Sequence, residues 1–119
     1  MSLTKRAELA CLLANMIADH KGQQVVVLDL RSLHSWTDFF IIATVTSTTH
    51  QVGLQKHIKE FAKVSDLEIL RHQRKVPADD EWSLIDMGDI VVHLMSERSR
   101  VFYDLERLWS EAPVLWKSQ

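Results

Sequence analysis

The segment WSLIDMGDIVVHLM, residues 82–95, decides the fold of this chain. It contains two runs, 82–86 and 89–95, that are rich in β-branched and aromatic residues and therefore predict strands. Met87 and Gly88 lie between the runs, and a two-residue separation is typical of a tight β-hairpin. The segment thus predicts two paired antiparallel strands, with Gly88 at a positive φ angle.

Toward the N-terminus the pattern predicts one helix and two strands. Apolar residues recur at helical spacing from Thr4, which can cap the helix, to about Asp19, and Gly22 is placed as the residue that follows its C-terminus. Residues 24–30 form an almost unbroken apolar run, which is typical of a strand covered on both faces. Residues 39–45 are rich in aromatic and β-branched residues and predict a second strand.

Between these strands and the hairpin, a second helix follows the candidate caps at 46–49. A short third strand is predicted at 67–70, and an exposed loop at 71–81. The apolar face of the second helix is expected to contain Leu54, Ile58, Phe61 and Ala62.

A last helix is predicted after the hairpin. Ser96 can cap it, it continues to about Trp109, and Pro113 stops it. Its apolar face is expected to contain Val101, Leu105, Leu108 and Trp109.

The order of these elements predicts an α/β (α+β) protein with a mixed sheet of about five strands and helices packed on it. The 119 residues fit a single domain, with a core at about 4–110 and a C-terminal tail at 111–119. Apolar runs are too short to cross a bilayer, and no leader pattern is visible, so we expect a cytoplasmic protein that does not contact membranes.

Composition narrows the class of partner. The formal net charge is −2, which disfavours binding driven by the backbone of nucleic acids and makes a basic partner easier to accommodate. The single cysteine, Cys11, excludes an internal disulfide, and its apolar neighbours predict a buried structural thiol. Four tryptophans in so short a chain leave aromatic surface that is hard to bury, which predicts a homodimer.

The chain offers few candidates for chemistry. It has no glycine-rich phosphate loop, and His50 and His57 are too far apart on one helix to share a metal without other ligands, so we expect no cofactor. Asp86 and Asp89 flank the hairpin turn, where they could form a magnesium or acid–base pair, or simply bind the backbone of the turn.

The last helix also carries a second, polar and aromatic face. Arg100, Tyr103 and Arg107 lie beside its apolar face, and such residues are common at binding hot spots. The alternative is a solvated face with local ion pairs, such as Arg100 with Asp104.

Three motifs resemble the Iojap-like family, whose bacterial members are ribosomal silencing factors. The first is TDFFII at 37–42. The second is W-x-x-x-D-x-G-D-x-V-V-H at 82–93, and the third is R-x-x-Y-x-L-E-x-L-W at 100–109. They occur in the family's order over nearly the whole chain.

The resemblance implies a nucleotidyltransferase-like fold without enzyme activity. It also implies binding to the large ribosomal subunit at its fourteenth protein, which blocks joining of the small subunit and represses translation when nutrients are scarce. No sequence-specific contact with nucleic acid is expected. The residues that it places at the partner are Trp82, Asp86, Asp89, Tyr103, Glu106 and Trp109.

Two positions depart from the family's pattern. The family has Thr-Gly before the second helix, where this chain has Thr44-Val45, and Glu-Gly before the tryptophan, where it has Lys75-Val76. The first change affects the turn before the second helix, and the second replaces an acidic residue by lysine. Both bear on ribosome binding. The competing hypothesis is a metal-dependent nucleotidyl- or phosphoryl-transfer enzyme that uses Asp86 and Asp89.

Overall fold

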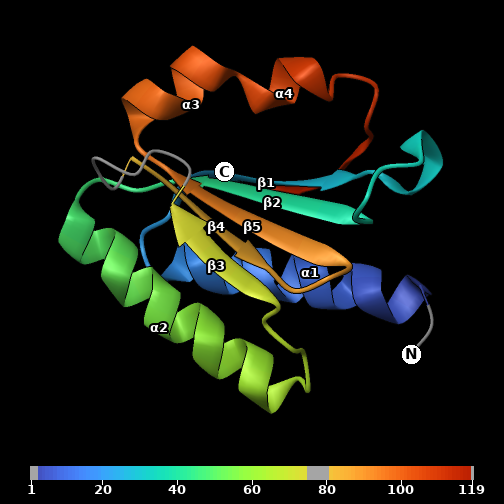
Figure 1. Cartoon of the computed structure of the whole chain (residues 1–119), viewed down its shortest axis with the longest axis horizontal. Helices are drawn as coiled ribbons and strands as arrows, with labels where there is room; N and C mark the ends of the chain where they lie inside the picture. The colour runs from blue at the N-terminus through green and yellow to red at the C-terminus, as the bar shows by residue number, and fades with distance from the viewer. Residues whose placement is uncertain (1–2, 75–80, 119) are drawn as a thin grey trace.

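The computed structural model describes residues 3–74 and 81–118, in which helices and strands follow the predicted order (Figure 1). The elements are α1 (Leu3–Asp19), β1 (Gln23–Asp29), η1 (Arg31–Leu33), β2 (Phe39–Thr44), α2 (Thr48–Val64), β3 (Arg71–Arg74), β4 (Trp82–Asp86), β5 (Ile90–Met95), α3 (Glu97–Tyr103), α4 (Leu105–Leu108) and β6 (Val114–Lys117).

The strands form one mixed sheet in the order β3-β4-β5-β2-β1-β6. β2 and β5 pair in parallel, and the other neighbours pair antiparallel. The predicted fold class is confirmed. The sheet has a sixth strand because residues 114–117, expected to belong to a tail, pair with β1.

Helices cover both faces of the sheet, with α1 and α2 on one face and α3 and α4 on the other (Figure 1). Every residue of β2 and β5 is buried, as expected for central strands covered on both sides. Alternate strand residues therefore enter two separate cores. Val27 and Ile41 lie in the core beneath α1 and α2, whereas Leu28 and Phe40 lie in the core beneath α3 and α4.

The hairpin at 82–95 forms as predicted, and Gly88 has a φ angle of +86°. The Asp86 carboxylate accepts a hydrogen bond of 2.8 Å from the Gly88 amide, which fixes the turn. β5 begins at Ile90, one residue later than the sequence suggested.

α1 ends at Asp19, as predicted, but it already includes Thr4, so Thr4 is not its cap. The left-handed residue after the helix is Lys21, at a φ angle of 74°, and not Gly22. Glycine is needed at position 22 for a different reason. A Cβ there would lie 2.6 Å from Ile17 Cγ2 and 2.8 Å from the Ile17 carbonyl oxygen.

α2 forms as predicted, with Ser47 accepting a hydrogen bond from the His50 amide as its cap. The strand predicted at 67–70 is wrong, because that segment forms no strand and only the Leu70 amide donates to the Asp86 carbonyl oxygen, at 2.7 Å. Pairing begins only at β3, where the chain runs alongside β4, within the segment predicted as a loop. Strand propensity alone does not fix which residues find a partner. Residues 75–80 of the predicted loop lie outside the described residues.

The last helix is not continuous. Ser96 caps α3, as predicted, but Asp104 takes a left-handed φ angle of 46° and separates α3 from α4. The break changes the phase of the helix, so the predicted apolar face is wrong. Val101 and Leu108 are 76% and 72% exposed, and only Leu105 of the predicted face is buried.

Within the described residues, no helix is both long and apolar enough to cross a membrane.

Candidate functional site

A row of rings runs beneath α3 and α4. Tyr103 lies 4.6 Å from Trp82 between ring centroids, and Trp82 lies 5.9 Å from His93. Phe40 continues the row at 4.5 Å from His93 and 5.5 Å from Trp109. We call these five residues the aromatic row. It connects β4, β5 and β2 to both short helices and so fixes their position on the sheet.

Trp82 and His93 are also joined by a hydrogen bond. The indole Nε1–H donates to Nδ1 of His93 at 3.1 Å, which satisfies the one polar group of the Trp82 ring. The imidazole therefore has its Nδ1 lone pair available as an acceptor. This bond explains why a tryptophan and a histidine occupy neighbouring positions on β4 and β5.

At one end, the aromatic row reaches an exposed apolar surface. Tyr103 is exposed, and Phe102, at 78% exposed, contacts it edge to face with ring centroids 4.9 Å apart. Val101 and Leu108 are exposed as well. We call Val101, Phe102, Tyr103 and Leu108 the helix patch.

The helix patch borders a groove of about 630 Å³ lined by Glu97, Arg98, Val101 and Phe102. Sequence reasoning missed Phe102 because it was not part of any motif. Phe102 is next to Tyr103 in sequence and falls outside the helical spacing of the core residues, and this position could have predicted its exposure. Phe102 contacts Tyr103 and shares the groove with Val101, and exposed apolar side chains that lie together in this way mark interaction surfaces in soluble proteins.

The two turn carboxylates are used by the protein itself. Asp86 is buried and bonded to the turn backbone, and Asp89 pairs with Arg6 of α1 at 3.2 Å. This geometry agrees with the structural interpretation of both residues. Among the described residues, no group of three or more His, Cys, Asp or Glu is arranged to hold a metal ion.

Glu106 is held by a buried arginine. Arg100, only 9% exposed, donates from Nε to Glu106 Oε1 at 2.9 Å and from Nη1 to Thr44 Oγ1 at 3.0 Å. The guanidinium thereby ties α4 to β2 across the break at Asp104. Arg100 was expected on an exposed binding face or, alternatively, on a solvated face paired with Asp104; its burial and its bond to Glu106 correct both expectations. A buried charge needs this many partners because desolvation would otherwise destabilise it.

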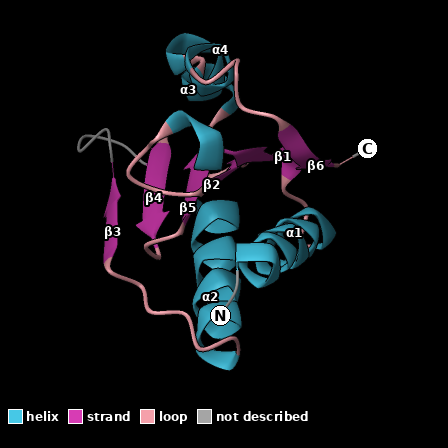
Figure 2. Ribbon diagram, turned by 90° about the vertical axis from the view of Figure 1, so that its right-hand side faces the viewer, coloured by secondary structure: helices cyan, strands magenta, loops and turns pink. Residues whose placement is uncertain are grey.

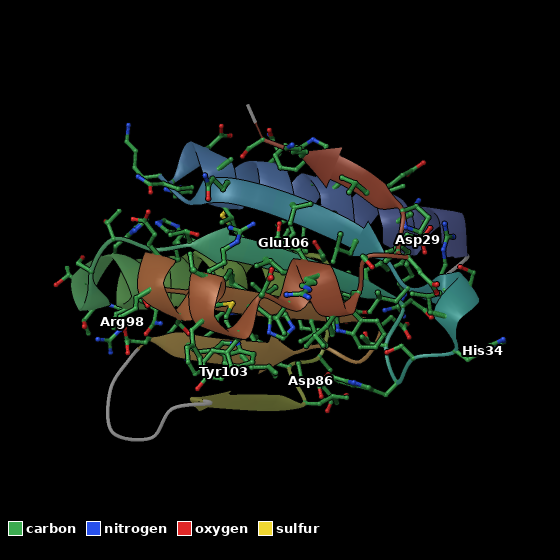
Figure 3. All side chains as sticks on the ribbon, turned by 90° about the horizontal axis from the view of Figure 1, so that it is seen from above. Asp29, His34, Asp86, Arg98, Tyr103 and Glu106 are labelled. Atoms are coloured by element: carbon green, nitrogen blue, oxygen red, sulfur yellow. The ribbon has the colours of Figure 1, made fainter. Side chains whose placement is uncertain are left out.

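The six predicted site residues therefore occupy different parts of the molecule. Figure 3 places Tyr103 over β4, Glu106 on the side of the helices nearer β1, and Asp86 at the far end of β4. The six residues do not form one cluster, and they are connected only through the helices and strands that carry them. Trp82, Tyr103 and Trp109 belong to the aromatic row.

Comparison with known proteins identifies the family. Residues 4–119 match the family described as ribosomal silencing factor during starvation. A ribosomal silencing factor of Halalkalibacterium halodurans is 35% identical over 91% of each chain. One of Treponema pallidum is 33% identical over 88% of this chain and 93% of the relative. This chain belongs to the ribosomal silencing factor family.

The fold agrees with that assignment. A crystal structure of a Chromobacterium violaceum protein superposes with a TM-score of 0.77 at 30% identity, over 92% of this chain and 88% of that one. The resemblance that the three motifs suggested is confirmed.

One departure from the family's pattern can be examined directly. Val45 is buried and is not among the described residues with positive φ, so the turn before α2 carries no strain at this position. Lys75 and Val76, the other departure, lie outside the described residues.

Among the described residues, the pKa values of three ionisable side chains are shifted: Asp29, Arg31 and Cys11. The Arg31 guanidinium, which donates to both carboxylate oxygens of Asp29 at 2.9 and 2.7 Å, lowers the pKa of Asp29. Partial burial raises the pKa of the Cys11 thiol, but the side chain is only half-buried and lines a surface groove, so the prediction of a buried thiol is wrong.

Proposed function

We propose that this member of the ribosomal silencing factor family binds the large ribosomal subunit at its fourteenth protein. Bound there, it keeps the small subunit from docking and so represses translation under nutrient limitation. Membership of the family supports a role in silencing ribosomes. The partner protein and the steric mechanism are the parts that require experiment.

The helix patch is the observation that carries this proposal. It presents four apolar or aromatic side chains to solvent on α3 and α4; Trp82 contacts Tyr103 from the sheet, and Tyr103 in turn contacts Phe102. Rigid aromatic side chains make effective anchors, because little conformational entropy is lost when they bind. We assign Phe102 and Tyr103 as the anchors, with Trp82 supporting Tyr103 from the sheet.

Two acidic side chains lie near the anchors. Glu97 lines the same groove as Phe102, and Asp104 directly follows Tyr103; both are exposed. Carboxylates at the rim of an interface speed encounter with a basic partner and orient it. Asp86 and Asp89 lie at the turn at the far end of β4 and contribute only by fixing the hairpin, whose strand β4 carries Trp82 beneath Tyr103.

The steric mechanism requires affinity and position but no catalytic group. A folded domain whose Cα atoms extend over 37 × 31 × 28 Å can separate two surfaces that must otherwise meet. We therefore assign the protein a binding role without turnover. Self-association is a further part of this proposal.

Co-sedimentation with purified large subunits at low salt tests the proposal. We expect wild-type protein to co-sediment and to reduce joining of small subunits. Phe102→Ala and Tyr103→Ala should each raise the dissociation constant about thirtyfold, the effect of losing an anchor worth about 2 kcal/mol. Val64→Ala is the matched control, because Val64 is 78% exposed on α2, on the opposite face of the sheet.

Melting curves of each variant separate lost binding from lost folding. Since Phe102 is 78% exposed, its truncation should change the melting temperature little. Failure of folded wild-type protein to co-sediment would contradict the proposal. If Phe102→Ala binds as tightly as the control, the contact with the large subunit lies outside the helix patch.

A further inference from the structure

A polar pocket lies between the short helices and the edge of the sheet that β1 and β6 form. Figure 2 shows β1 and β6 at this edge, with α3 and α4 over one face of the sheet and α1 on the other. Its volume is about 430 Å³, and we call it the edge pocket. The side chains that line it include Gln24, Val26, Arg100, Glu106, Val114 and Lys117. Figure 3 shows Glu106 on the side of the helices nearer β1, away from Tyr103 of the helix patch.

Arg100 presents one fixed donor group to the edge pocket. Its Nε donates to Glu106 at 2.9 Å, and its Nη1 donates to Thr44 Oγ1 at 3.0 Å. Among the described residues Nη2 has no hydrogen-bond partner, although the side chain as a whole is only 9% exposed. Because the other two bonds already hold the guanidinium, little side-chain entropy would be lost when a ligand binds to Nη2.

Lys117 adds a second cation from β6. It lies opposite Val26 in the pairing of β1 with β6, and residues that face each other in an antiparallel pair point to the same side of the sheet. Val26 belongs to the core beneath α3 and α4, so Lys117 points to the side on which Arg100 lies. In the part of the chain that the structure describes, the Lys117 ammonium forms no ion pair or hydrogen bond.

The backbone of β1 is irregular where it borders the pocket. The pairing of β1 with β2 shifts register between Gln23 and Val26, and Gln24 has a left-handed φ angle of 47°. Left-handed residues other than glycine are strained and gather at ligand sites, and bulges turn side chains toward such sites. Ser118 fixes this irregular stretch, because its Oγ accepts a hydrogen bond of 2.9 Å from the Val25 amide. Gln24 thereby brings its side-chain amide to the edge pocket.

Charge and shape together indicate the class of ligand. Arg100 and Lys117 against Glu106 leave one positive charge in excess, and donors outnumber acceptors. A guanidinium beside an ammonium suits the oxygens of a phosphate group. The pocket is of the size that holds whole small molecules, and Val26 and Val114 offer an apolar wall for the rest of the ligand. The Glu106 carboxylate repels polyanions, and so does the net charge of −2, which disfavours RNA.

We propose that the edge pocket binds the phosphate group of a small phosphorylated metabolite. Arg100 Nη2 and the Lys117 ammonium bind the phosphate oxygens, and the Gln24 amide donates to the same group. The remainder of the ligand lies along Val26 and Val114. Glu106 keeps its bond to Arg100 and so holds the guanidinium in position. Binding here is independent of the proposed contact between the helix patch and the ribosome.

Titration followed by amide chemical shifts in NMR tests the pocket, at constant ionic strength. The probes are inorganic phosphate, adenosine monophosphate and adenosine. We expect both phosphates to shift the amides of Gln24, Val26 and Lys117 saturably, the nucleotide to bind more tightly, and adenosine to cause no such shift. No saturable shift with either phosphate would overturn the proposal. Binding of inorganic phosphate alone would restrict the pocket to the free ion and overturn the assignment of a metabolite.

Two variants that should fold normally remove the ligand's partners. Lys117→Gln and Gln24→Gly should each raise the dissociation constant of adenosine monophosphate at least about fivefold. Lys117 is exposed, and glycine adopts the φ angle of position 24 without strain. Lys59→Gln is the matched control, because it removes one exposed lysine charge from α2, on the opposite face of the sheet. Equal binding by Lys117→Gln and Lys59→Gln would refute the site.

A single-stranded RNA oligomer separates the two sources of phosphate. We expect it to leave the amides of Gln24, Val26 and Lys117 unshifted at concentrations at which adenosine monophosphate saturates them. If the oligomer shifts these amides, the nucleotide does not, and Lys117→Gln weakens the effect, the pocket binds the backbone of RNA and the assignment of a small molecule is wrong.

Discussion

Replacement of Arg100 by alanine should destabilise the protein strongly, although the residue is an arginine on a short surface helix. Its guanidinium is buried beneath α3 and α4, and it donates to Glu106 and to Thr44. Truncation removes both bonds and leaves the Thr44 hydroxyl without this partner. The helices would lose their polar attachment to β2.

The magnitude follows from these contacts. Breaking a buried ion pair by removing one member costs roughly 3–5 kcal/mol. The Glu106 side chain is 43% exposed and can be rehydrated, so we take the lower end, about 3 kcal/mol. For 119 residues the unfolding entropy is about 0.25 kcal/mol per kelvin, and the melting temperature should therefore fall by about 12 °C.

Thermal and urea unfolding of Arg100→Ala measure this loss, and Arg107→Ala is the control. Arg107 lies on the adjoining helix but is exposed, so its truncation should change stability by less than about 0.5 kcal/mol. A double-mutant cycle with Glu106→Gln should give a coupling energy of about 1–2 kcal/mol. If Arg100→Ala costs no more than the control, the buried attachment does not hold the helices in place.

Two further predictions concern backbone geometry and acid stability. Gly22→Ala should lower the free energy of unfolding in urea by about 1–3 kcal/mol, because the added Cβ overlaps the end of α1. Gly53→Ala should stabilise α2 by up to about 1 kcal/mol, because nothing lies within 4 Å of the added Cβ. Equal effects of the two changes would refute the overlap. Because Arg31 lowers the pKa of Asp29, the pair contributes stability above the unfolded pKa of about 3.9 and loses it as pH falls through the folded pKa. The difference in unfolding free energy between wild type and Arg31→Gln can be measured at several pH values. It should be largest above about pH 4 and vanish in stronger acid. A difference that is constant with pH would contradict the role of the pair.

Local sequence patterns were sufficient for the central part of the fold. The unbroken apolar run of β1 predicted a strand covered on both faces, and aromatic and β-branched residues predicted the strands β2 and β5. Gly88 predicted the hairpin turn, and Ser47 and Ser96 predicted two helix starts. In each case a few neighbouring residues determine the geometry.

The motifs also determined the family, since they depend on residue types and not on contacts. They could not reveal how the six predicted site residues lie in space. Trp82 and Tyr103 are in contact, whereas Asp86 lies at the other end of the same strand. That separation depends on the direction in which α3 and α4 cross the sheet.

Other features were decided only by tertiary structure. β6 is a strand because β1 offers it an edge, and β3 begins where the chain meets β4. Asp104 interrupts the last helix, although nothing in the local pattern requires a break, and the interruption places Arg100 among partners from β2 and α4. Turns and helix caps are stabilised by residues close to them in the sequence, so local patterns predict them. Strand pairing and burial depend on residues far away in the chain, so the free energy that they contribute cannot be assessed from local sequence.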